Sequence, residues 1–233
     1  MTSRITRSDP RRSASHLATL AGAALLLAGC ATGFGEAATG TVDVVVVPAG
    51  TVSGGVRFES AFLTVTGIEL EEAEAEAGAD GGHGHHHHLF EPAPLAGPVT
   101  LDLLGGAQTV RRLTVPASSF TALAVGQAPA FDGVAAGCAF FARGTATLDG
   151  DNVPVRICLK AVTGVLARVP LELDIGHEEE AEMRLLLSVN DLLTDVDVSL
   201  LPREGDGSIV IDARRPFEAT VIRKNLESAF STL

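Results

Sequence analysis

The densest group of chemically active side chains is a histidine tract in the first half of the chain. Five histidines occupy six consecutive positions: His83, His85, His86, His87 and His88. Neutral imidazole nitrogens are ligands for Zn²⁺, Ni²⁺ and Cu²⁺, and the neighbouring glycines let the backbone bend around an ion. The tract therefore predicts a labile transition-metal site. Two alternatives stay open: a solvated low-complexity insert, and a pH sensor, because unperturbed imidazole titrates at about pH 6.5.

An acidic segment lies directly before the tract, where glutamates between Glu69 and Asp80 alternate with alanines. Neither segment has an apolar face to bury, so we expect residues 71–88 to form one disordered, exposed loop. His177 with Glu178 is a second small group, either an auxiliary metal ligand pair or a solvated turn. The zinc-protease pattern His-Glu-x-x-His fails there, because Ala181 stands where the second histidine is needed.

The first of the three cysteines, Cys30, follows Leu27-Ala28-Gly29. A basic segment with four arginines comes first, and then an apolar run from Leu17 to Leu27 that is too short to span a bilayer, which takes about 20 residues. This arrangement resembles the lipobox of a bacterial lipoprotein precursor. The resemblance implies a signal peptide over residues 1–29 and acylation of Cys30, with palmitate as the kind of chain that would anchor it. An ordinary cleaved signal with a chance cysteine is the alternative.

Cys138 and Cys158 are the other two cysteines, and in an exported chain they would meet an oxidising compartment. We expect a disulfide between them; two free thiols and a metal thiolate pair are the alternatives. The two residues flank Asp149-Gly150, a strong signal for a β-hairpin turn. A tight register through that turn does not place the cysteines opposite each other, so the disulfide requires a bulge or loop near Phe140 to Gly144.

Composition narrows the classes of partner and activity. The net charge is −12, and because four Arg and one Asp precede Cys30, the chain from Cys30 onward carries −15. This acidity argues against nucleic acid as a partner. The sequence contains no Gly-x-Ser-x-Gly elbow, no Walker loop, no dinucleotide glycine pattern and no Cys-x-x-Cys. We therefore do not expect an enzyme.

The elements that would carry these residues are mostly strands. Residues 30–39 are small or polar and predict a flexible tether. From residue 40 onward, about ten runs rich in β-branched residues alternate with turn signals. Within residues 56–70 the apolar parity changes at Gly67, which predicts a bulge. Apolar residues at three- and four-residue steps predict a helix over about residues 216–231. The expected fold is all-β, a single antiparallel β-sandwich over residues 40–233 with a C-terminal amphipathic helix.

Four short motifs resemble the DUF4382-type domain of bacterial secreted lipoproteins, whose function is unknown, and the resemblance covers roughly residues 40–190. They are Gly40-Thr41-Val42-Asp43-Val44, Phe62 to Leu70, Val99 to Leu104 and Leu113 to Phe120. The chain departs from the family after the first strand, where Val47-Pro48-Ala49-Gly50 replaces an acidic turn. The resemblance implies a prealbumin-like β-sandwich and an exported lipoprotein, and it transfers no functional residues.

These observations predict a lipid-anchored protein of the cell envelope that binds Zn, Ni or Cu through its His-rich loop, for buffering or for delivery to a transporter. Ala31 in place of the aspartate that retains lipoproteins at the inner membrane favours the outer membrane of a Gram-negative bacterium. The alternative is a structural or adhesion-type envelope module whose His-rich loop is incidental. The expected partners are the membrane, through the lipid anchor, and a metal transporter or another envelope protein.

Overall fold

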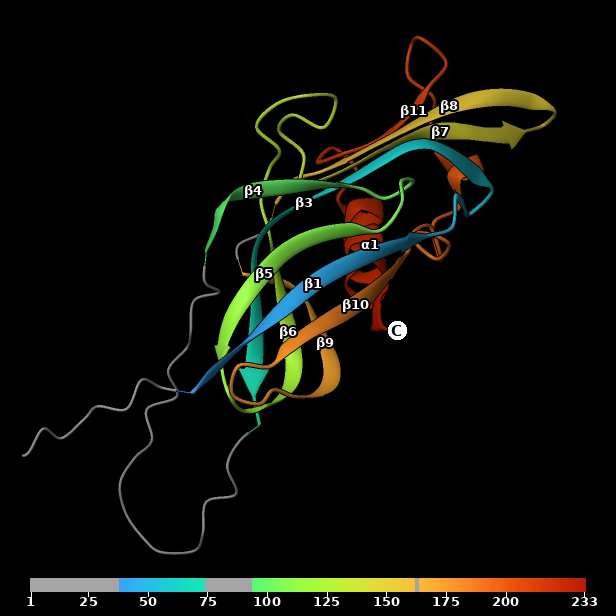
Figure 1. The fold of residues 1–233 in the computed structure, drawn as a ribbon. Helices are drawn as coiled ribbons and strands as arrows, with labels where there is room; N and C mark the ends of the chain where they lie inside the picture. Colours follow the sequence, from blue (N-terminus) through green and yellow to red (C-terminus); the bar gives the residue numbers. More distant parts are fainter. Residues whose placement is uncertain (1–37, 74–93, 162–163) are drawn as a thin grey trace, which may run out of the picture. The chain divides into compact units, whose positions relative to one another are not determined.

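The computed structural model describes residues 38–73, 94–161 and 164–233, which form two β-sheets and one C-terminal helix (Figure 1). The elements are β1 (Thr39–Ala49), β2 (Val52–Ser53), β3 (Val56–Glu72), β4 (Pro94–Asp102), β5 (Gln108–Pro116), β6 (Ser119–Gln127), β7 (Phe140–Leu148), β8 (Asp151–Leu159), β9 (Val165–Asp174), β10 (Glu180–Ser188), the 3₁₀ turn η1 (Val198–Leu200), β11 (Ile209–Ile211), α1 (Pro216–Ser228) and β12 (Phe230–Thr232).

The two sheets confirm the expected all-β sandwich with a C-terminal helix. The smaller sheet has the order β12-β10-β1-β5. The larger has the order β11-β8-β7-β3-β6-β9, and β2 and β4 also pair with β3. Most pairs are antiparallel, but β1 pairs with β10 and β11 with β8 in parallel. Strands this distant in the sequence are not joined by a hairpin, so no short turn imposes an antiparallel direction on them.

Strand β3 is central to the larger sheet, because three long strands pair with successive parts of it. β7 pairs with residues 56–63, β4 with residues 62–67 and β6 with residues 65–72. At the junction the Thr64 amide donates to the Ala139 carbonyl at 2.8 Å, and the Thr64 carbonyl accepts from the Ala128 amide at 3.1 Å. The register shifts between Val65 and Gly67, which confirms the bulge predicted from the parity change.

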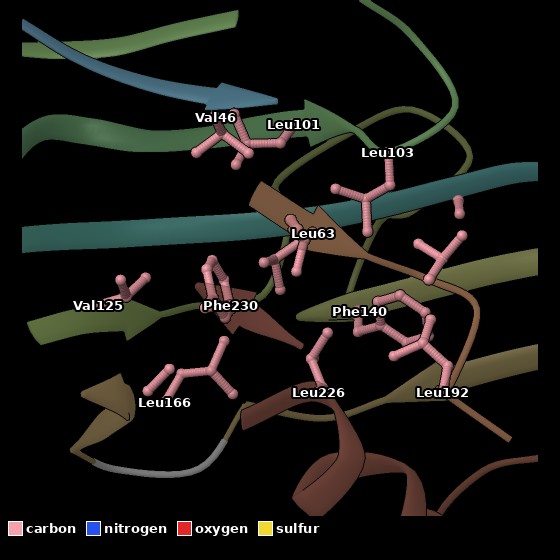
Figure 2. Packing of buried hydrophobic residues seen from close by; sticks show 14 of the residues in the cluster. Val46, Leu63, Leu101, Leu103, Val125, Phe140, Leu166, Leu192, Leu226 and Phe230 are labelled. Atoms are coloured by element: carbon pink, nitrogen blue, oxygen red, sulfur yellow. The ribbon is translucent and has the colours of Figure 1, made fainter. Parts of the chain in front are cut away.

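One hydrophobic core lies between the sheets and reaches the helix (Figure 2). Val46 of β1 lies beside Leu101 of β4 in this view, and Leu63 of β3 is the cross-strand partner of Phe140 in β7. Leu226 of α1 closes the core on its far side. Leu63 and Phe140 have no exposed surface. The apolar residues of the alternating pattern thus lie on the face of each strand that is buried in the core.

The C-terminal helix is shorter than the sequence predicted. It begins with Pro216 in its first turn and buries Ala219, Ile222 and Leu226, but it ends at Ser228 instead of near residue 231. Residues 230–232 form β12, which pairs with the edge of β10. Phe230 is only 7 % exposed there. A strand satisfies the backbone groups of β10 and buries the Phe230 ring, and both gains outweigh one further helical turn.

Candidate functional site

Most of the predicted site residues lie outside the described part of the chain. These are Cys30, His83, His85, His86, His87 and His88. What the structure does describe is where the segment that carries the histidines joins the fold: β3 ends at Glu72 and β4 begins at Pro94. The predicted start of the loop at residue 71 is wrong. Glu71 and Glu72 still belong to β3, where they pair with Ala122 and Phe120 of β6.

Two acidic side chains at the end of β3 take part in the packing and ion pairs of the domain. Burial, and then repulsion from the Glu71 carboxylate, raise the pKa of Glu69 above its ordinary value. Glu71 itself pairs with Arg168, with 3.0 Å between Oε1 and Nε. Glu72, the last residue of β3, is exposed.

Backbone hydrogen bonds gather several chain segments at one end of the domain, which we call the N-terminal end. The turn between β5 and β6 is the centre of this group. The Ala117 amide donates to the Ala38 carbonyl at 2.8 Å, and the Ala73 amide donates to the Ser119 carbonyl at 2.8 Å. The residue at which the domain begins and the residue at which the acidic and His-rich segment begins are therefore held beside one turn (Figure 1).

The turn between β9 and β10 belongs to the same end. The Glu178 amide donates to the Thr39 carbonyl and the Thr41 amide to the Glu179 carbonyl, both at 2.8 Å. Gly40 lies between these two bonds. A Cβ on Gly40 would meet the carbonyl oxygens of Gly176 and Glu179 at 2.8 and 2.9 Å, so the absence of a side chain lets the turn pack on β1.

His177 and Glu178 occupy the exposed tip of this turn. Nε2 of His177 lies 3.8 Å from Oε1 of Glu178, and the two side chains are 63 % and 85 % exposed. They are near each other, as expected, but they make an incomplete metal site. Within residues 38–73, 94–161 and 164–233, no group of three or more His, Cys, Asp or Glu side chains is arranged to hold a metal ion.

Cys138 and Cys158 form a disulfide with a Cα–Cα distance of 5.3 Å. The expected bulge near Phe140 to Gly144 is wrong, because β7 and β8 pair without a register shift from Phe140 to Leu148. The irregularity lies before β7. Gly137 adopts a positive φ of 77°, and the Ala139 amide donates to the Leu159 carbonyl at 2.7 Å. The chain thus bends toward β8 just before β7 begins, and this bend brings Cys138 next to Cys158.

A groove on the outer face of β7, β8 and β11 contains charged residues that the sequence reasoning missed. Arg143 and Arg156 lie directly opposite each other in the hairpin register, and both line this groove. The hairpin turn could have predicted this arginine pair, because a tight turn at Asp149-Gly150 pairs residues whose numbers are symmetric about it. Reading the exposed faces of both arms in that register would have paired the two arginines.

No family model, curated protein or solved structure matches the chain. The resemblance to the DUF4382-type domain therefore stays a prediction. In the part of the chain that the structure describes, no helix is long and apolar enough to cross a membrane.

Proposed function

We propose that this protein is a lipid-anchored component of the bacterial cell envelope, of DUF4382-type kinship, that binds Zn²⁺, Ni²⁺ or Cu²⁺ through its histidine tract. The observation that carries the proposal is the density of imidazoles, five within residues 83–88. A single short segment with this many nitrogen ligands can coordinate an ion without help from the rest of the domain. The composition of the segment predicts disorder without metal, and ordering it costs entropy, so the affinity is modest and suits exchange or delivery.

The placement of the domain's N-terminal end supports delivery at a membrane. Ala38 follows Cys30 by eight residues, and a fully extended chain of that length spans at most about 28 Å. Acylation of Cys30 would hold the N-terminal end within that distance of the bilayer. The chain leaves the domain toward the histidine tract at Ala73, which lies at the same end. Metal held by the tract would be offered to a partner in the membrane, such as a transporter.

His177 and Glu178 fit this arrangement as auxiliary ligands. They lie on the β9–β10 turn, whose backbone bonds to Thr39 and Thr41 place it at the N-terminal end. Their side chains are exposed, so they can turn toward an ion held by a neighbouring segment. The net charge of −15 from Cys30 onward adds a general attraction for cations.

Calorimetric titration of the mature protein with Zn²⁺ tests the proposal. We expect about one to two ions per chain, and weaker binding as the pH falls through about 6.5, because only neutral imidazole coordinates metal. A variant with serine at all five tract positions should lose this binding and keep its β-sheet circular dichroism. The matched control is His177→Ala, which removes an imidazole outside the tract and should retain most of the binding.

The two variants separate the possible outcomes. Equal binding by the wild type and the five-serine variant would contradict the proposal and move the metal elsewhere, first to His177 and its neighbouring glutamates. Absence of binding by the wild type would also contradict it and would favour a structural or adhesion-type envelope module. An unacylated mature protein, or one that begins at a residue other than Cys30 by mass spectrometry, would contradict the anchor.

A further inference from the structure

Two adjoining cavities, with volumes of about 450 and 350 Å³, form one open groove on the outer face of β7, β8 and β11. Arg156, Val210 and Arg214 line both cavities. One end of the groove is bounded by the segment that leads into β11, and the other by the loop before β7, which the Cys138–Cys158 disulfide attaches to β8. Each volume falls within the range of small-molecule sites, roughly 300–1,000 Å³.

Arg156 stands at the centre of this groove without a close counter-charge. It is the cross-strand partner of Arg143, and like charges directly opposite each other destabilise a sheet. Arg143 has a carboxylate nearby, with 3.7 Å between its Nε and Oε2 of Glu59. Among the described residues, no carboxylate lies within ion-pair distance of Arg156, although the charges of Asp206 and Asp212 act on it from farther away.

The carboxylates along the groove have other partners. Glu204 lies 3.3 Å from Nη2 of Arg214, and Asp212 accepts from Nε of the same arginine at 3.1 Å. Asp206 accepts from the amide and the hydroxyl of Ser208 at 3.0 and 2.7 Å. Glu204 and Asp212 thus pair with Arg214, and Asp206 bonds to Ser208. Among the described residues, none of these carboxylates takes up the exposed guanidinium of Arg156, so its donors are open to a ligand.

The end of the groove beside the disulfide combines apolar side chains with Lys160, whose ammonium group donates to the Gly137 carbonyl at 2.8 Å. Val134 projects from the loop before β7 with 67 % of its surface exposed. Phe141 of β7 and Val210 of β11 line the same cavity. Backbone hydrogen bonds from the Ala130 amide to the Cys138 carbonyl and from the Gly137 amide to the Ala130 carbonyl, both 2.9 Å, hold the loop in shape. The guanidinium of Arg156 therefore lines the same cavity as the apolar side chains of Val134 and Phe141.

We propose that this groove binds a small organic carboxylate with a short apolar tail. The guanidinium of Arg156 donates two parallel N–H bonds to the carboxylate, a geometry that carboxylates match well. The negative charge also relieves the repulsion between Arg156 and Arg143. The tail packs on Val134 and Phe141. This site is independent of the histidine tract and of the lipid anchor, and either proposal can fail without the other.

Saturation-transfer NMR with the whole mature chain tests the site, with 4-phenylbutyrate as the probe. We expect a saturable signal with a Kd on the order of 1 mM, appropriate for a ligand of this size in an open groove. Arg156→Gln should reduce the signal at least fivefold, and Val134→Ser at least twofold. Arg184→Gln is the matched control, because it removes an exposed arginine from β10 in the other sheet, and it should leave the signal unchanged.

Two further probes separate the contributions of charge and tail. Neutral 4-phenylbutanol and tail-free acetate should each give a signal at least fivefold weaker than 4-phenylbutyrate. The proposal is overturned if Arg156→Gln and Arg184→Gln behave alike, if the alcohol binds as well as the carboxylate, or if acetate or inorganic phosphate competes equally well.

Discussion

The contacts of Asp212 with Arg214 show how a single carboxylate is held beside β11. Oδ1 of Asp212 accepts from the Arg214 amide at 2.9 Å, and both carboxylate oxygens accept from Nε at 3.1 Å. The side-chain hydrogen bond from Arg214 is the main cause that lowers the pKa of Asp212 below its ordinary value. The ionised form is thus the one that stabilises the folded state.

This shift predicts a pH-dependent effect of Asp212→Asn. A lowered pKa in the folded state contributes stability above the ordinary aspartate value of about 3.9, and that contribution is lost as the pH falls through the folded value. We expect the variant to lose at most about 1 kcal/mol at pH 7, because the ion pair is solvent-accessible, and the difference from the wild type to shrink as the pH is lowered below the ordinary aspartate value. Thermal denaturation over a pH series from 7 downward measures this. Asp151→Asn, a change at an exposed hairpin position, should show no such dependence, and a difference that persists at low pH would contradict the interpretation.

For the two cysteines, the sequence predicted the pairing but not the backbone irregularity that allows it. Their pairing was predicted from the number of cysteines and from the expectation of export, and the structure joins Cys138 to Cys158. The position of the supporting irregularity did not follow. It depends on Gly137 and on the bond between the Ala139 amide and the Leu159 carbonyl, which are tertiary details of a loop. Local patterns in the sequence carry little information about such loops.

At the scale of elements, the start of β1 depends on Gly40. The β9–β10 turn lies so close that a Cβ would meet the carbonyl oxygens of Gly176 and Glu179 within 3 Å. The backbone cannot yield there without weakening the bonds that join Thr39 and Thr41 to the turn. This close approach explains a glycine inside a strand, where the residue is otherwise unfavourable.

Gly40→Ala should therefore destabilise the domain. Overpacking of this kind costs about 1–3 kcal/mol, which corresponds to a fall of roughly 2–10 °C in melting temperature for a domain of this size. Gly106→Ala is the control, because its Cβ would meet nothing within 4 Å. Thermal denaturation followed by circular dichroism measures both variants. Equal melting temperatures for the two would show that the turn can move away from β1 without cost.

The elements that the sequence predicted well are those specified by local signals. Asp149-Gly150 marks the hairpin of β7 and β8, and Gly67 marks the bulge in β3. The helix began as predicted at Pro216, a residue that favours the first turn. Its end was wrong because β12 exists only through the edge of β10. The parallel pairing of β1 with β10 was likewise not predictable, since it joins strands more than a hundred residues apart.

At the scale of the whole molecule, the long strand β3 separates two ends of the domain. The β7–β8 hairpin tip lies near the first residues of β3, where Val56 pairs with Ala146. The N-terminal end lies near its last residue, where the Ala73 amide bonds to Ser119. Residues 56–72 rise by about 50 Å along the strand at roughly 3.3 Å each, and the bulges shorten this path by bending it. The sequence indicated the longer strands, but it could not show that Ala38 and Ala73 lie at the same end, because that requires the three-dimensional pairing.

The proposed acylation of Cys30 predicts which of these ends faces the bilayer. The eight residues from Cys30 to Ala38, at most about 28 Å when extended, would keep the N-terminal end near the lipid and leave the hairpin tip farther away. A fluorescent donor attached at His177→Cys should therefore transfer energy to acceptors on the headgroups of phosphatidylcholine vesicles more efficiently than a donor at Asp151→Cys. Both positions are exposed, and both labels leave the Cys138–Cys158 disulfide intact.

The comparison is made on acylated protein, with Cys30→Ser as the control that should neither associate with the vesicles nor transfer energy from either position. Higher efficiency from residue 151 would place the opposite end of the domain on the membrane and would remove the structural support for delivery of metal to a membrane partner. Equal efficiency from both positions would mean that the domain lies flat on the bilayer, and would contradict the orientation in the same way. Because the measurement requires no metal, it tests the anchor and the geometry separately from the histidine tract.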